Sequence, residues 1–281
     1  MKKKVYTALT VAGSDSGGGA GIQADLKTFM AHGVFGASAV TAITAQNTMG
    51  VSGIHMIPPE MVAAQIDAVV SDIGAGAVKT GMLGTAAIVE AVAGRVMANR
   101  IKNLVVDPVM VATSGDRLSG DGTAAAYIKS IFPLALLVTP NLPEAEVFCG
   151  RPILSEDTLR EAALRILEYG PRWVLIKGGH RDFSGDGSEV VDLLTDGKHY
   201  EEIRNPRIGT RCTHGTGCTL SAAITAGLAR GMDLPGAVRS AEKYLHEAIR
   251  TAVPVGKGHG PVNHSVNLKQ VIFPVRIQET E

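Results

Sequence analysis

The sequence predicts an α/β protein in which helices cover both faces of a mainly parallel β-sheet. Short runs that are almost entirely apolar alternate with amphipathic segments along most of the 281 residues. Almost fully apolar strands are typical of parallel sheets, because helices bury both faces and supply the crossovers between strands. An Asp-Gly pair at 196–197 separates two β-rich runs, which predicts a hairpin and therefore an antiparallel element at one edge of the sheet.

The elements follow from the residue patterns in order. Strands are expected at the β-rich or apolar runs 5–12, 37–45, 51–57, 77–80, 104–107, 134–139, 173–177, 189–195 and 198–203. Helices are expected at 20–31, 59–71, 86–99, 123–131, 144–149, 155–169, 218–230 and 235–252. No Pro/Ser-rich linker, charge block or repeat interrupts the chain, so we expect a single domain over residues 1–281.

The composition excludes several classes of partner. Lys and Arg total 27 and Asp and Glu total 27, so no basic excess is available for a nucleic-acid backbone or an anionic membrane surface. The three cysteines contain no CxxC pair, which argues against a disulfide framework or a structural zinc site. No run approaches the roughly 18 apolar residues of a membrane span. We expect a cytoplasmic protein with a small-molecule substrate, no nucleic acid and no membrane.

The segment 213–218, Thr-His-Gly-Thr-Gly-Cys, is the most informative in the chain. Gly215 and Gly217 allow a tight turn directly before a helix rich in small residues. The free amide groups and the positive end of the helix dipole then converge on one point, which favours an anion. Cys218 stands at that point, where a helix N-terminus is expected to lower its pKa and favour the thiolate. This combination predicts phosphate chemistry.

Five further polar or glycine-rich clusters follow predicted strands, at 13–21, 79–82, 107–110, 139–144 and 177–180. In a parallel sheet these strand ends share one edge, where ligands bind. The first cluster lacks the register of a dinucleotide fingerprint, and no Walker A motif is present. We expect its glycines to form a flap or to let the backbone approach a substrate.

These segments together resemble the hydroxymethylpyrimidine kinase/phosphomethylpyrimidine kinase family of thiamine biosynthesis. The matching segments cover nearly the whole chain, at 12–28, 41–48, 79–82, 106–110, 139–145, 177–180, 213–222 and 255–262. The resemblance implies a ribokinase-like three-layer α/β/α fold with a mainly parallel sheet and an antiparallel edge. It also implies ATP-dependent phosphorylation of 4-amino-5-hydroxymethyl-2-methylpyrimidine and then of its monophosphate, with Mg²⁺ as cofactor and a homodimeric assembly.

The resemblance implies a pyrimidine site made of Gly13, Ala20, Asp25, Gln46, Met82 and Val109. The Gln46 amide both donates and accepts hydrogen bonds, as reading an aminopyrimidine edge requires. Asp25 also suits a first helical turn without any ligand, because its charge favours the helix dipole. Met82 and Val109 would wall the flat ring, although ordinary core packing also explains them. Gly13 and Ala20 would contact the ligand through their backbone and small size.

The resemblance further implies a nucleotide and metal end of the site. Lys177, Asn141, Glu144 and Thr216 are expected to bind the nucleotide, and Asp107 and Glu144 to hold Mg²⁺ through hard oxygen ligands. Cys218 would be the catalytic base, because a loose phosphoryl-transfer transition state demands little early deprotonation of the alcohol. The amides of Gly215 and Gly217 would stabilise the transferring phosphoryl group. Cys149 and Cys212 are assigned to packing.

Three alternatives remain open from the sequence. Pyridoxal or pyridoxine kinase is the nearest, because its branch shares the cysteine cradle and acts on a related hydroxymethyl heteroaromatic alcohol. Cys218 with His214 could instead be a thiol nucleophile for acyl transfer. The third alternative is a ligand-binding regulator on a kinase scaffold. The sequence assigns no role to His214, and Lys257 is either a phosphate ligand or a solvated loop residue.

Overall fold

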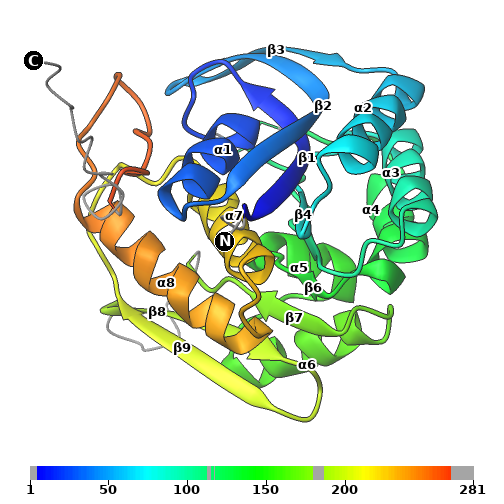
Figure 1. Ribbon diagram of the computed structural model, residues 1–281. Helices are drawn as coiled ribbons and strands as arrows, with labels where there is room; N and C mark the ends of the chain where they lie inside the picture. The colour runs from blue at the N-terminus through cyan, green and yellow to red at the C-terminus, as the bar shows by residue number, and fades with distance from the viewer. Residues whose placement is uncertain (1–4, 113–114, 117, 180–186, 267–281) are drawn as a thin grey trace, which may run out of the picture.

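The computed structural model describes residues 5–112, 115–116, 118–179 and 187–266, and it confirms the α/β class (Figure 1). Within this part of the chain one sheet has the order β3-β2-β1-β4-β5-β6-β7-β8-β9. The strands are β1 (Thr7–Asp15), β2 (Phe35–Asn47), β3 (Gly50–Met56), β4 (Ala77–Thr80), β5 (Leu104–Val106), β6 (Leu137–Val138), β7 (Trp173–Ile176), β8 (Glu189–Thr195) and β9 (Tyr200–Pro206). The helices are α1 (Gly21–Ala31), α2 (Pro59–Asp72), α3 (Ala86–Ala98), α4 (Thr123–Ala126), α5 (Leu142–Cys149), α6 (Glu156–Leu167), α7 (Thr216–Ala229) and α8 (Leu234–Arg250).

The middle of the sheet is parallel and both edges are antiparallel. Strands β2, β1, β4, β5, β6 and β7 run in one direction. The Asp-Gly hairpin is confirmed, since β8 and β9 are antiparallel and Gly197 has a φ of 86°. The other edge was not anticipated, because β3 pairs antiparallel with β2 across residues 48–49. These residues are Thr and Met, which carry no hairpin signal, so the sequence located this strand but not its partner.

Alternating strand residues supply the two sides of the core. Val78 and Val106 face the cluster formed with α2, α3, α5 and α6, whereas Ala77 and Val105 face the cluster formed with α7 and α8. Helix α1 packs beside α7 on this second face (Figure 1). The two-sided burial explains why the parallel strands are apolar without a polar face.

One predicted helix is shorter than expected. The segment 123–131 is α-helical only at α4 and continues as a π-helix over Tyr127–Ile131 and a 3-10 turn over Phe132–Leu134. Pro133 lacks the N–H that an α-helix needs, so the chain tightens before the next strand. The predicted strand at 134–139 is accordingly reduced to the two residues of β6.

The arrangement of β1 creates the ligand-binding position. Strand β1 has β2 on one side and β4 on the other, so the order of the sheet reverses beside it. Crevices at the carboxyl ends of strands next to such a reversal are where open α/β sheets bind ligands. In the described residues, no helix combines the length and the apolar character needed to cross a membrane.

Candidate active site

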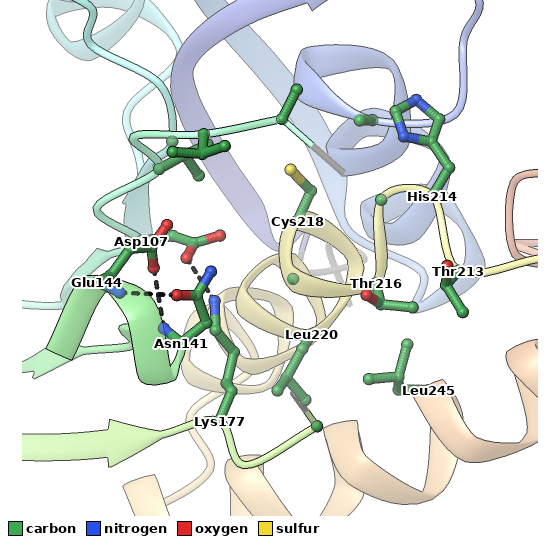
Figure 2. Close-up of a pocket in the computed structure, with 18 of the residues that line it drawn as sticks. Asp107, Asn141, Glu144, Lys177, Thr213, His214, Thr216, Cys218, Leu220 and Leu245 are labelled. Atoms are coloured by element: carbon green, nitrogen blue, oxygen red, sulfur yellow. Dashed lines mark hydrogen bonds and ion pairs between the residues drawn. The ribbon is translucent and has the colours of Figure 1, made fainter. Parts of the chain in front are cut away.

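The cradle at the start of α7 is built by glycine. Gly215 caps the helix with a φ of 78°, and a Cβ at this position would come within 1.9 Å of the Gly19 carbonyl oxygen. The first-turn amides of α7 have no partner within the helix, so they face the cavity at the strand edge. That cavity, of about 720 Å³, is lined by Gly215, Thr216, Gly217 and Cys218 (Figure 2).

The prediction that the pKa of Cys218 is lowered is wrong for the protein without ligands. Burial raises the pKa of this thiol to about 11, and the carboxylates of Asp25 and Asp107 add to the rise. The Lys79 ammonium and a hydrogen bond from the Gly21 backbone act in the opposite direction but do not balance them. Local position at a helix start is therefore outweighed by loss of hydration and by nearby negative charge.

Asp107 and Lys177 form the polar floor of the cavity. The Lys177 Nζ lies 2.8 Å from Oδ1 of Asp107, and the hydroxyl of Ser221 donates to the other oxygen at 3.1 Å. Burial opposes ionisation of Asp107, but Lys177 and Lys79 outweigh it and lower the pKa of Asp107. A Cβ at Gly217 would lie 3.1 Å from the Lys177 Nζ, so the lysine reaches the cradle directly.

Glu144 and Asn141 lie beside this pair as a capping box at the start of α5 (Figure 2). Each backbone N–H of the two residues donates to the side chain of the other at 2.9 Å. Burial raises the pKa of Glu144 to about 7, and the Asp107 charge contributes, although Lys177 lowers it. Two carboxyl groups that disfavour each other's ionisation are a suitable donor set for a hard cation.

The donor set fits Mg²⁺ better than a fully protein-bound ion. Among the described residues no group of three or more His, Cys, Asp or Glu side chains is placed to hold a metal. Mg²⁺ usually takes one or two carboxylates and completes its shell with water and substrate phosphates. Asp107 and Glu144 therefore suit an ion that arrives with a nucleotide.

The other end of the cavity has small and apolar walls. Gly13, Ala20, Gln46, Met82 and Val109 line this end, and all the predicted catalytic, nucleotide and metal residues line the same cavity. A Cβ at Gly13 would lie 2.6 Å from the Met82 methyl group, so a larger residue there would require the Met82 side chain to move. The Thr44 hydroxyl lies 3.1 Å from Oε1 of Gln46 and helps to fix its amide.

Asp25 is the predicted site residue that the structure does not bring to the cavity wall. Its side chain is fully buried, with the Lys79 Nζ and the Thr10 hydroxyl each 2.6 Å from a carboxylate oxygen. The sequence suggested a helix-dipole role or a ligand contact, whereas the position is occupied by a buried ion pair. Lys79 was missed because it ends an apolar strand and its partner is 54 residues away.

The remaining side chains that the sequence left open are also placed. His214 Nε2 lies 2.8 Å from Oδ2 of Asp15, and the ring and the Cys218 sulfur lie apart (Figure 2). A Cys218–His214 pair is therefore not present. Lys257 is exposed and does not line the cavity. His180 lies outside the described residues.

A second lobe of the cavity went unpredicted. It lies between β8, β9 and α8 and is lined by Val190, Asp192, Asn205, Ile208, Glu242, Leu245 and Ile249. The only available signal was the helical spacing of apolar residues in α8, which indicates burial and not a ligand. The lobe continues from the Lys177 end of the cavity, so a long ligand could span both.

Comparison with known proteins agrees with this geometry. The family model for phosphomethylpyrimidine kinase matches residues 15–263. The thiamine biosynthesis bifunctional protein of Geobacter sulfurreducens is 52% identical over 94% of this chain, which spans 53% of that longer protein. The hydroxymethylpyrimidine/phosphomethylpyrimidine kinase of Rhizobium meliloti is 52% identical, with 92% of this chain and 96% of that kinase covered.

A solved structure gives the same answer for the fold. The pyridoxal kinase from Staphylococcus aureus in complex with AMP-PCP and pyridoxal superposes with a TM-score of 0.85 at 36% identity. The match covers 94% of this chain and 95% of that one, and this neighbour has the ribokinase-like fold. The extent of the family match and the identity to full-length kinases show that the chain belongs to the phosphomethylpyrimidine kinase family.

Proposed function

We propose that this protein transfers the γ-phosphoryl group of ATP to the hydroxymethyl group of 4-amino-5-hydroxymethyl-2-methylpyrimidine, and then phosphorylates the monophosphate to the diphosphate. The observation that carries the proposal is one cavity that joins a small apolar pocket to an anion cradle with a thiol. Family membership and the names of the relatives support the pyrimidine alcohol as substrate and thiamine biosynthesis as the pathway.

The pyrimidine ring binds between Met82 and Val109, and Gln46 reads its amino edge. Thr44 fixes the Gln46 amide, which limits the ring orientations that can form two hydrogen bonds. Gly13 and Ala20 leave room for the ring to approach the backbone. The hydroxymethyl group then points toward Cys218 and the start of α7.

The triphosphate lies along the cradle and the floor of the cavity. The amides of Gly215, Gly217 and Cys218 face the transferring phosphoryl group, where preorganised donors lower the barrier. Lys177 neutralises phosphate charge, and Asn141 and Thr216 complete the nucleotide site. Asp107 and Glu144 would hold Mg²⁺, which when bound supplies positive charge to the phosphate oxygens.

Cys218 takes the proton of the substrate hydroxyl. The hydroxyl oxygen forms a bond to the γ-phosphorus, the bond from that phosphorus to the bridging oxygen breaks, and ADP leaves with the electron pair. The proton passes to Cys218 in its thiolate form, which the Lys79 charge favours although burial leaves it the minor form before ligands bind. Because the transition state is loose, this proton transfer occurs late in the reaction.

A paired substrate assay tests the proposal. Phosphorylation of the pyrimidine alcohol with ATP and Mg²⁺ is expected to be much faster than that of pyridoxal. The reverse preference would favour pyridoxal kinase, which the similar Staphylococcus aureus structure makes the second candidate. No nucleotide consumption with either alcohol would refute both kinases. Cys218→Ala is expected to lower kcat strongly and to leave substrate binding largely intact.

The same proposal covers the assembly and location. We expect a homodimer in the cytoplasm that binds neither nucleic acid nor membrane. Sedimentation at micromolar concentration measures the mass directly, and a monomer would contradict the expected dimer.

A further inference from the structure

The Asp15 carboxylate accepts four hydrogen bonds. Oδ1 accepts from the Gly17 N–H at 2.8 Å, and Oδ2 accepts from Gly19 at 3.0 Å, from Ala20 at 2.8 Å and from His214 Nε2 at 2.8 Å. The two oxygens of a carboxylate offer about four acceptor positions. Three of the four hydrogen bonds go to Oδ2 and one to Oδ1, and the side chain is only 2% exposed, so Asp15 is held tightly by the surrounding loops.

The charge state of this group fixes the direction of its hydrogen bond with His214. Burial opposes ionisation of Asp15, but the His214 side chain and the Ala20 backbone outweigh it and lower the pKa of Asp15. An ionised carboxylate only accepts, so Nε2 of His214 carries the proton. His214 is itself 7% exposed. The pair is therefore buried, with His214 as the hydrogen-bond donor and Asp15 as the acceptor.

The pair joins two glycine-rich loops that touch each other closely. A Cβ at Gly19 would lie 2.5 Å from the His214 ring, and a Cβ at Gly215 would lie 1.9 Å from the Gly19 carbonyl oxygen. The backbone of His214 also donates to the carbonyl of Gly260 at 3.0 Å. The loop at 16–20 and the cradle loop at 213–217 are therefore held as one unit.

The first of these loops also reaches the opposite end of the cavity. The Ser16 hydroxyl donates to the Gln46 carbonyl at 2.7 Å and accepts from the Gln46 N–H at 2.8 Å. Ser16 follows Asp15 directly, so a continuous set of hydrogen bonds connects Gln46 to His214. The distance between the ring pocket and the cradle depends on these contacts.

We propose that Asp15 and His214 are positioning residues, which clamp the cradle loop to the glycine-rich loop and so fix the α7 amides relative to the bound pyrimidine ring. This role rests on the proposed kinase function. In this proposal His214 positions the cradle loop and does not transfer a proton, since its Nε2–H donates to Asp15 and not to Cys218 or the substrate. Misplacement of reacting groups by about 1 Å costs on the order of 100-fold in rate, so the clamp matters for kcat.

Three variants test the clamp kinetically. His214→Leu keeps the bulk but removes the donor, His214→Gln keeps an N–H near Asp15, and Asp15→Asn weakens the acceptor. We expect His214→Leu to lower kcat by about tenfold or more with the pyrimidine KM changed less than about threefold. His214→Gln is expected to recover most of kcat. The matched control is His32→Gln. His32 lies outside the cavity, so kcat and KM of this variant should equal those of wild type.

Hydrogen exchange makes the result independent of the kinase assay. In protein without substrates, peptides over 14–21 and 211–219 should exchange faster together in His214→Leu and close to wild type in His214→Gln. If wild type shows no turnover, the proposed function fails while exchange still decides the clamp. The clamp would be refuted if His214→Leu left both hydrogen exchange and kcat unchanged. It would also be refuted if His214→Gln and His214→Leu lost kcat to the same extent. If His214→Leu does not fold, unchanged exchange and kcat in Asp15→Asn overturn it equally.

Discussion

Replacing Lys79 with methionine is expected to destabilise the protein by about 3–5 kcal/mol, because it leaves the Asp25 carboxyl group fully buried without a cation. The Nζ–Oδ1 distance is 2.6 Å and both side chains are fully buried. Methionine has nearly the same length as lysine, so packing changes little. The Thr10 hydroxyl still donates a hydrogen bond to the Asp25 carboxyl group, at 2.6 Å.

The magnitude follows from opposing terms at this pair. At an effective dielectric constant of about 20, unit charges 2.6 Å apart attract by about 6 kcal/mol. Loss of hydration costs several kcal/mol for each ion, so the intact pair contributes little net stability. Removing Lys79 eliminates the attraction between the two charges, but the cost of burying the Asp25 carboxyl group away from water remains. The double variant Lys79→Met/Asp25→Asn removes both charges and should retain a loss of only about 1–3 kcal/mol, for the unpaired amide.

Urea unfolding of wild type, both single variants and the double variant measures this cycle. Arg95→Met is the control, since Arg95 and Asp67 form a pair 38% and 45% exposed and should contribute less than about 1 kcal/mol. A double variant no more stable than Lys79→Met would refute the reasoning. The same proteins decide the role of Asp25. If it binds the pyrimidine, the folded double variant will have a greatly raised pyrimidine KM.

Three further predictions concern buried ionisable groups. If the Cys218 thiolate is the proton acceptor, kcat should rise about tenfold per pH unit between pH 7 and 9, since the thiol pKa is about 11; a flat profile would exclude it. Glu144 has a folded pKa of about 7 against 4.5 unfolded, so its contribution to stability falls as pH rises through that window. Glu144→Gln should therefore raise Tm at pH 7.5 and increase the KM for Mg-ATP, and an unchanged KM would contradict the metal role. Burial and Asp192 raise the pKa of Glu242, so the contribution of Glu242 to stability should fall as pH rises above 4.5, and Glu242→Gln should gain stability relative to wild type over that range by urea titration. Parallel curves for the two proteins would exclude this contribution.

The architecture was predictable because it depends on local composition. Apolar strands ending in polar clusters identify a parallel sheet and the edge that binds ligands, and both were confirmed. The β2–β3 pairing was not predictable, since the connecting Thr48 and Met49 favour no hairpin. The π-helical turn over Tyr127–Ile131 was also missed. Its hydrogen-bond register differs from that of an α-helix, but its residue types are those of an ordinary α-helix.

The site was predictable where a residue and its neighbours in the sequence form a motif of known chemistry. Cys218, Gly215 and Gln46 could be selected from motifs, and each lines the cavity. Pairings across the fold could not be selected. Lys79 with Asp25 and His214 with Asp15 join residues far apart in the chain, and no local pattern encodes them. The pKa of Cys218 is raised first by burial and then by the charges of Asp25 and Asp107, which is why the helix start alone gave the wrong direction.

These pairings also explain how the site can be charged and still fold. Lys79 compensates Asp25, and Lys177 compensates Asp107, so the first four buried charges cancel in pairs. Glu144 is the fifth group and has no cation of its own, and its pKa rises to about 7. Within this group of five, the deficit of positive charge lies beside Asp107 and Glu144, at the floor below the cradle. A nucleotide that arrives with a divalent cation would relieve this repulsion, whereas a free triphosphate would increase it. Under the proposed kinase function, this unbalanced charge would favour the metal-bound form of the nucleotide.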